Sequence, residues 1–320
     1  RLVVDIADLV DPDSRTVTLA SGATIGYDYL VYALGSTGAA LTVPGAAEFA
    51  YPISELEHAQ PLRSAMETVQ PGAPVVIVGA GPTGLEVAAE LGEQGRSVTL
   101  VCGGVLGPYF SESTRRAVTK RMRKLGVTVV DGAGAKVTEV RNDSVLLADG
   151  RELPSAVTIW TAGFGVPDLA RRSGLATDAI GRLLTDETLT SIDDPFIVGA
   201  GDAVAPSNAP LRMSCQAAIP LGAQAANTVL SRIAGDEPAS VNQAFTGQCV
   251  SLGRKAGVIQ VAHLDDRPMP LFIGGRAAAT IKEAVCKGTV WQLGVEARKP
   301  GSYVWLKGGK RAERVAAAVR

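Results

Sequence analysis

Residues 75–86 read Val-Val-Ile-Val-Gly-Ala-Gly-Pro-Thr-Gly-Leu-Glu, and this stretch decides the fold. Four apolar residues typical of a buried strand lead into Gly-x-Gly-x-x-Gly, and a small-residue helical pattern follows to residue 94. In such a unit the first glycine permits a tight turn, the second lets a pyrophosphate approach the backbone, and the third lets the helix pack against the strand. The helix N-terminus offers free N–H groups to the phosphates. The pattern predicts a dinucleotide at Gly79, Gly81, Pro82, Thr83 and Gly84; a glycine-rich turn without a ligand is the alternative.

The segments after this stretch continue an alternation of strands and helices. Strands are expected at 98–101, 127–130 and 157–161, and a second helix at 113–125. This alternation is typical of a parallel sheet covered by helices. Extended segments at 136–140 and 144–147 are expected to pair antiparallel beside it. We therefore predict an α/β domain over residues 72–165.

The end of the second strand normally distinguishes the two nicotinamide cofactors. An acidic residue there would bind the ribose 2′-hydroxyl of NADH, and a basic residue would accommodate the 2′-phosphate of NADPH. The sequence instead reads Val101-Cys102-Gly103-Gly104, so neither cofactor is indicated. Cys102 is expected either to donate a weak hydrogen bond at the ribose or to be a small buried thiol.

Glu86 follows the glycine motif on the same helix, one turn before Glu90. One interpretation places its carboxylate beside the nicotinamide or a flavin, as a polar wall or proton relay. The other is a carboxylate stabilised by the positive end of the helix dipole. Both remain open, and Glu86 is a candidate catalytic residue.

Two buried strands outside this domain end in glycine-rich turns. One lies within residues 27–36 and stops at Gly35; the other, 196–199, leads into Gly201 and Asp202. A carboxylate in such a turn could hold a sugar or ribitol hydroxyl. Further strands are expected at 2–6, 16–19, 250–252 and 257–261, and further helices at 215–234 and near 277–286.

Composition excludes several classes of protein. The 320 residues suggest about two domains. With 31 basic and 32 acidic side chains, the chain has no net field that would hold nucleic acid, and no apolar run approaches the ~18 residues of a membrane span. The four cysteines are scattered and predict neither a disulfide framework nor a metal site. We expect a cytoplasmic protein with at most peripheral contact at the inner face of a membrane.

Four motifs together resemble a known family. They are residues 27–36, the fingerprint at 79–86, Trp-Thr-Ala-Gly-Phe at 160–164 and Gly-Ala-Gly-Asp at 199–202. They are similar to those of the two-dinucleotide-binding-domain flavoprotein oxidoreductases, in the branch of type II NADH dehydrogenases and apoptosis-inducing-factor-like proteins. The resemblance implies FAD and NAD(P)H as cofactors. It also implies hydride transfer from NAD(P)H to FAD and electron transfer to a small-molecule acceptor such as a quinone.

The resemblance assigns residues to each cofactor. For NAD(P) it implies the glycine motif, Gly79 to Gly84, together with Ala162 and Gly163, to which the position of Cys102 at the end of the second strand adds that residue. For FAD it implies Ala33, Gly35, Gly201, Asp202 and Ala203.

The resemblance also implies a domain order of two Rossmann-like domains, with the NAD(P) domain inserted in the FAD domain. Residues 1–71 would be a partial FAD domain, 72–165 the NAD(P) domain, 166–235 the second part of the FAD domain and 236–320 a small α+β C-terminal region. The family's first glycine motif would precede Arg1, so we expect either a fragment or a chain that has lost its first FAD half-site.

The electron acceptor is the least determined part of the prediction. Type II NADH dehydrogenases carry Ala-Gln-x-Ala-x-Gln at the quinone site, and here Gln216 and Ala218 match while Pro220 replaces the second glutamine. Gln216 is therefore a candidate acceptor-site residue. In a disulfide reductase of this fold the redox dithiol would precede Arg1, so the absence of CxxC does not decide the matter. That class is disfavoured because the chain lacks a C-terminal His-Pro pair. A non-catalytic NAD(P)-binding sensor or interaction protein is the alternative.

Two basic segments are expected to be solvated. The tail at 307–320 has too little apolar area for firm membrane anchoring, so a solvated terminal helix is favoured. The basic helix at 115–124 is likewise expected to present its charges to water.

Overall fold

The computed structural model describes residues 1–318 and separates into two units. The first unit comprises residues 1–37, 164–245 and the segment from 303 onward; the second comprises residues 38–163 and 246–302. The second unit is thus inserted into the first, in agreement with the predicted fold class. The domain limits predicted at residues 71, 165 and 235 remain predictions.

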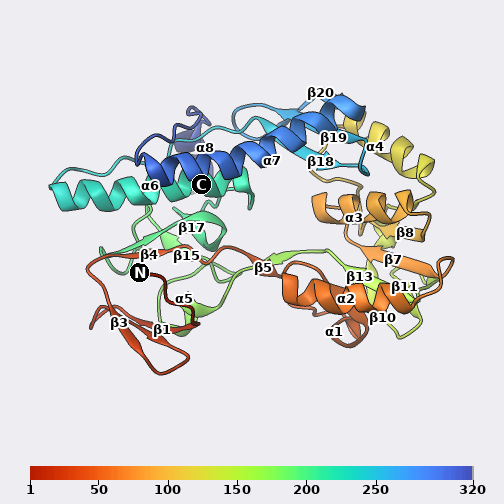
Figure 1. The fold of residues 1–320 in the computed structure, drawn as a ribbon, viewed down its shortest axis with the longest axis horizontal. Coiled ribbons are helices and arrows are strands. Elements are labelled where there is room, and N and C mark those ends of the chain that lie inside the picture. The colour runs from red at the N-terminus through yellow and green to blue at the C-terminus, as the bar shows by residue number, and fades with distance from the viewer. Residues whose placement is uncertain (319–320) are drawn as a thin grey trace. The chain divides into compact units, whose positions relative to one another are not determined.

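A five-stranded parallel sheet is the centre of the second unit (Figure 1). Its strands lie in the order β6 (Ala50–Pro52), β13 (Val157–Trp160), β7 (Pro74–Val78), β8 (Ser97–Val101) and β9 (Thr128–Val130). Helices α3 (Pro82–Glu93) and α4 (Glu112–Lys124) connect β7 to β8 and β8 to β9. The predicted alternation is confirmed, because the apolar runs behind it form the core: Val75, Ile77 and Leu100 are fully buried.

Shorter elements surround this sheet. The antiparallel sheet of β10 (Val137–Val140), β11 (Ser144–Leu147) and β12 (Glu152–Pro154) confirms the pairing expected between residues 136–140 and 144–147. The other short elements are β5 (Thr37–Gly38), α1 (Ala46–Phe49), α2 (Leu56–Thr68) and the 3-10 turn η1 (Ala133–Ala135).

Residues 246–302 add a second layer to this unit. Strands β18 (Gly247–Ser251), β19 (Gly257–Ala262) and β20 (Pro268–Gly274) form an antiparallel sheet, followed by α7 (Gly275–Arg298). Val250 and Leu252 share a core with Leu85 of α3 and Val118 of α4. The sequence did not indicate β20, which carries two prolines; as an edge strand it tolerates them. Neither α7 nor any other helix within residues 1–318 has the length and apolarity needed to span a bilayer.

The first unit contains two parallel strand pairs. Strand β4 (Leu30–Tyr32) pairs with β16 (Ile197–Gly199), and β15 (Leu183–Thr185) pairs with β17 (Val204–Pro206). Helix α6 (Cys215–Ala234) has its predicted limits. It begins at Cys215 because the Ser214 hydroxyl caps its N-terminus by accepting the Ala217 N–H. The short elements are β14 (Phe164–Gly165), α5 (Leu169–Arg172) and the 3-10 turn η2 (Gly201–Ala203).

The N-terminal strands form a meander. Strands β1 (Ala7–Asp11), β2 (Thr16–Leu19) and β3 (Thr24–Gly26) pair antiparallel, with the Asp11 carboxylate accepting N–H groups of the first turn. The strand expected at residues 2–6 was wrong. Leu2, Val4 and Ile6 are exposed, and the pairing with β2 begins at Ala7.

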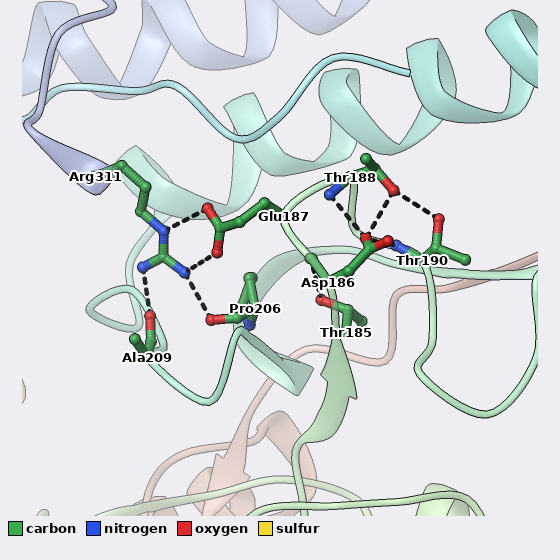
Figure 2. A network of polar contacts seen from close by, with 8 residues as sticks. All are labelled: Thr185, Asp186, Glu187, Thr188, Thr190, Pro206, Ala209 and Arg311. Carbon is green, nitrogen blue, oxygen red and sulfur yellow. Dashed lines mark hydrogen bonds and ion pairs between the residues drawn. The ribbon is translucent and has the colours of Figure 1, made fainter. Parts of the chain in front are cut away.

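The basic tail forms the expected terminal helix, and Lys307 and Lys310 are exposed, but Arg311 is buried. Helix α8 (Arg311–Ala318) begins at Arg311, which is only 7% exposed. Figure 2 shows its guanidinium donating to both carboxylate oxygens of Glu187, at 3.0 and 2.8 Å, and to the carbonyls of Pro206 and Ala209. The expectation of a solvated tail is therefore wrong at Arg311, because a run of charges does not reveal a carboxylate 124 residues away. Residues 319 and 320 of this tail lie outside the described residues.

The basic helix α4 is solvated only in part. Arg115 donates to the carbonyl of Leu106, and Arg121 donates to the carbonyl of Leu252. Arg116, by contrast, is exposed and pairs with Glu112 one turn earlier. Two of the arginines of α4 therefore tie loops to the helix, which the charge pattern alone did not indicate.

Candidate functional site

The glycine turn lies where the order of the parallel sheet reverses. From β7 the chain proceeds to β8 and β9 on one side, and it then returns to β13 on the other side of β7. Residues 79–81 leave the carboxyl end of β7 at this point, and Gly79 donates its N–H to the carbonyl of Val101. In open α/β sheets, ligands bind in the crevice at such a switch point.

Packing requires glycine at two positions of the turn. Gly79 has a φ of 110°, and a Cβ there would lie 2.8 Å from the backbone nitrogen of Ala162. A Cβ on Gly84 would overlap the carbonyl oxygen of Gly79. The Thr161 hydroxyl donates to that same oxygen at 3.0 Å, which holds β13 against the turn. These two glycines are explained without a ligand.

Gly81 is different. Its φ of −73° is open to any residue, and no atom lies within 4 Å of the position that a Cβ would occupy. Gly81 is also the N-cap of α3, where no side chain of the described residues caps the helix and Pro82 has no N–H. The N–H groups of Thr83 and Gly84 therefore begin the helix beside open space. Open space and helix N–H groups together fit a pyrophosphate.

The other residues predicted for NAD(P) lie at the same edge. Ala162 and Gly163 follow β13, beside the Gly79 turn, and Gly163 has a φ of 85°. Cys102 follows β8 and donates its N–H to the carbonyl of Val130. Burial raises the pKa of the Cys102 thiol to about 12, with a smaller contribution from the charge of Asp131. The thiol is therefore neutral and can offer at most a weak hydrogen bond.

Glu86 has partners that the sequence did not indicate. Its Oε1 accepts the N–H of Ser251 at 3.0 Å and is ion-paired with Lys282 of α7, and Lys282 also donates to the Ser251 hydroxyl at 2.9 Å. Glu86, Lys282 and Ser251 line a cavity of about 530 Å³ between α3, β18 and α7. Lys282 was missed because 196 residues separate it from Glu86. Whether Glu86 faces a flavin or nicotinamide remains a prediction.

The residues predicted for FAD gather in the first unit. Tyr32 of β4 is in register with Gly199 of β16, and the N–H of Ala200 donates to the carbonyl of Tyr32. The turns that contain Ala33 and Gly35, and Gly201 to Ala203, therefore leave the same edge of this strand pair. Gly35 and Gly201 both have positive φ, 71° and 76°, which favours glycine.

Asp202 joins three segments of this edge. Its Oδ2 accepts the Ser36 hydroxyl at 2.9 Å, and its Oδ1 accepts the N–H of Ser214 at 3.1 Å. The carboxylate is thus held by the turn after β4 and by the N-terminus of α6. Each oxygen retains a second lone pair, so the carboxylate can still accept a hydroxyl, as a ribitol chain would require.

Gln216 occupies the first turn of α6. Ala218, one of the two residues that match the quinone motif, lies 3.7 Å from the position of a Cβ on Gly201, so its small side chain lets the Gly201 turn approach the helix. Pro220 cannot donate an N–H to the carbonyl of Gln216. Pro220 thus removes the second amide of the motif and alters the backbone pairing of Gln216.

Comparison with known proteins identifies the family. The family model described as pyridine nucleotide-disulphide oxidoreductase matches residues 5–222. An NADH dehydrogenase-like protein of Mycobacterium tuberculosis is 31% identical over 243 residues, which cover 69% of this chain and 60% of the relative. The NADH dehydrogenase-like protein YutJ of Bacillus subtilis is 29% identical over 84% of this chain and 75% of its own length. The chain thus spans about 60% of the length of the mycobacterial relative.

Solved structures show the same fold. The sulfide:quinone oxidoreductase of Aquifex aeolicus matches with a TM-score of 0.71 at 20% identity, covering 91% of this chain and 74% of that one. NDH2 of Plasmodium falciparum, solved with NADH, matches with a TM-score of 0.69 at 16% identity, covering 88% of this chain and 79% of that one. With the family match over residues 5–222, this chain belongs to the pyridine nucleotide-disulphide oxidoreductase family.

Proposed function

We propose that this chain belongs to a flavin-dependent oxidoreductase that accepts hydride from NAD(P)H and delivers electrons to a small-molecule acceptor, a quinone. The observation that carries the proposal is the open space at Gly81, at the switch point of the sheet. Packing does not require glycine there, whereas a bound pyrophosphate does. The relatives named as NADH dehydrogenase-like support the choice of a nicotinamide nucleotide.

Each cofactor has its own set of residues. NAD(P)H would be held by the turn from Gly79 to Gly84, with Cys102, Ala162 and Gly163 at the same sheet edge. FAD would be held by the turns at Ala33 and Gly35 and at Gly201 to Ala203, with Asp202 accepting from ribitol hydroxyls. When bound, the flavin supplies the hydride and electron chemistry.

The chain's own polar residues have orienting roles in this proposal. Ser36 and Ser214 fix the Asp202 carboxylate from two directions, so that it does not have to be ordered when a ligand arrives. Lys282 and Ser251 fix the carboxylate of Glu86 in the same way. His58 has no role in this proposal, because it is half-exposed and paired with Glu55 on the surface.

The quinone acceptor is supported by one relative and by part of a motif. The internal alternative NAD(P)H-ubiquinone oxidoreductase A1 of Arabidopsis thaliana is 29% identical over 205 residues, covering 55% of this chain and 40% of its own length. Gln216 and Ala218 match the motif, and Pro220 departs from it. With a lipid-soluble acceptor, we propose that the protein works at the inner face of a membrane through peripheral contact.

An anaerobic titration tests this function. The natural full-length protein is purified, its absorption spectrum is recorded, and NADH is added without oxygen. We expect a bound flavin whose absorption near 450 nm is bleached by NADH and restored by a soluble quinone. A full-length protein that binds NADH but neither retains nor accepts flavin would refute the proposal and support the non-catalytic sensor instead.

A second comparison tests the acceptor alone. If bleached flavin is reoxidised by ferricyanide but not by a short-chain quinone, the oxidoreductase assignment stands and the quinone is wrong. If the short-chain quinone does reoxidise the flavin, Gln216→Ala should slow that reoxidation while leaving bleaching by NADH unchanged.

A further inference from the structure

The strand next to β8 supplies an acidic residue that β8 itself lacks. Strands β8 and β9 are parallel, and Val101 is in register with Val130. The next residues are Cys102 and Asp131, and the N–H of Cys102 donates to the carbonyl of Val130 at 2.9 Å. Cys102 and Asp131 are therefore neighbours, one step beyond the sheet.

Their side chains also point to the same face. Residues in register on adjacent strands share a face, and successive residues alternate. Cys102 and Asp131 thus both lie opposite to Val101 and Val130. The charge of Asp131 contributes to the raised pKa of the Cys102 thiol, which is consistent with a carboxylate close to that sulfur.

The other residues at this edge are glycines, which have no side chain to fill the space beside them. Gly103 and Gly104 follow Cys102, and Gly132 follows Asp131; a Cβ on any of them would meet no atom within 4 Å. A hydrogen bond of 2.6 Å from the Gly132 N–H to the Gly104 carbonyl ties the two loops together. The edge beyond β8 and β9 is thus a fixed backbone with open space, next to the partly buried Cys102 and the exposed Asp131.

Asp131 is available to a ligand. It is exposed, and within residues 1–318 its carboxylate has no hydrogen-bond or ion-pair partner. In a doubly wound fold whose pyrophosphate lies on the glycine turn, the adenosine ribose lies across the end of the second strand. Here that place is the end of β8, beside Cys102 and Asp131.

We propose that Asp131 accepts the 2′-hydroxyl of the adenosine ribose and thereby selects NADH over NADPH. A carboxylate at this point is an acceptor for the hydroxyl of NADH and repels the 2′-phosphate of NADPH. The inference rests on the proposed nucleotide site at Gly81 and goes beyond it, because the end of β8 carries no charge that would make the choice.

Binding of the two cofactors to the natural full-length protein tests the inference. Dissociation constants for NADH and NADPH are measured by calorimetry for the wild type, for Asp131→Asn and for the control Asp143→Asn. Asp143 is an exposed aspartate in the turn between β10 and β11, so its substitution removes the same charge from the same unit. Thermal unfolding of each variant shows whether the fold is unchanged.

We expect the wild type to bind NADH at least tenfold more tightly than NADPH. Asp131→Asn should weaken NADH and strengthen NADPH, so that their ratio falls at least tenfold, and Asp143→Asn should leave it within twofold. NADH lacking the adenosine 2′-hydroxyl should bind the wild type and Asp131→Asn equally well. This last result would distinguish contact with the hydroxyl from a general effect of charge.

The failures can be told apart. If the wild type binds neither cofactor, the proposed nucleotide site is wrong. If it binds NADH but the preference over NADPH is absent, or is unchanged in Asp131→Asn, the site stands and the role of Asp131 is overturned.

Discussion

Replacing Gly81 by alanine separates a requirement of the ligand from a requirement of the fold. The φ of −73° suits alanine, and the new Cβ would meet no protein atom within 4 Å. Reduced freedom of the unfolded chain should stabilise the variant by about 0.4–1 kcal/mol, and the loss of a good N-cap residue should cost about as much. We therefore expect the free energy of unfolding to change by less than about 0.5 kcal/mol.

Nucleotide binding should respond differently. A methyl group placed in the space for the pyrophosphate should cost about 1–3 kcal/mol, as overpacking does elsewhere, which corresponds to a roughly 5- to 150-fold rise in the dissociation constant for NADH. Gly84→Ala is the matched control, because its Cβ would overlap the Gly79 carbonyl and the helix would have to move. It should lower the free energy of unfolding by about 1–3 kcal/mol.

The two quantities are measured on the same proteins, unfolding by urea titration and NADH binding by calorimetry. If Gly81→Ala binds NADH as the wild type does, the open space at Gly81 does not belong to the ligand. If Gly84→Ala is as stable as the wild type, the turn tolerates a side chain that its geometry excludes.

Three further predictions concern single residues. Asp202→Asn keeps one oxygen for the Ser214 N–H and replaces the other by an amide group that cannot accept a ribitol hydroxyl, which should cost about 1–3 kcal/mol of FAD binding and raise its dissociation constant, measured by flavin fluorescence; unchanged affinity would remove Asp202 from the site. The pKa of Cys102 is raised in the folded state. Its contribution to the free energy of unfolding is therefore fully present below about pH 9 and is lost as the pH rises to about 12. At pH 8, iodoacetamide should therefore modify exposed Cys286 long before Cys102 by mass spectrometry, and equal rates would contradict its burial. Arg311→Met leaves the Glu187 carboxylate without its buried partner and should lower the free energy of unfolding by roughly 2–4 kcal/mol; a loss below about 0.5 kcal/mol would show that the pair is dispensable.

The nucleotide-binding half of the chain was predictable because its signals are local. Each apolar run of β7 and β8 is directly followed by the glycine or helix that defines its connection, and α6 begins beside its own capping residue, Ser214. Such signals depend on neighbours in the sequence, which a single chain displays. The strand expected at residues 2–6 fails for the complementary reason: an apolar run does not show whether a partner strand exists.

Partners distant in sequence account for what was missed at the sites. Lys282 reaches Glu86 from α7, and Arg311 reaches Glu187 from the tail. Arg311 stood in a tail that was expected to be solvated, and Lys282 stood in a helix for which the sequence indicated no partner. Asp131 was missed in another way: an acidic residue was sought at the end of β8, whereas parallel pairing places the end of β9 next to it.

The tests at Gly81 and Asp131 support each other because they act on different parts of one ligand. NADH and NADPH carry the same pyrophosphate, so Gly81→Ala should weaken both to the same extent and leave their ratio unchanged. They differ at the adenosine 2′ position, so Asp131→Asn should change the ratio. A nucleotide bound elsewhere on the chain would show neither effect, and one bound in the reverse orientation would show the first without the second. The pair of substitutions therefore determines both where the nucleotide binds and which way it lies across β7 and β8.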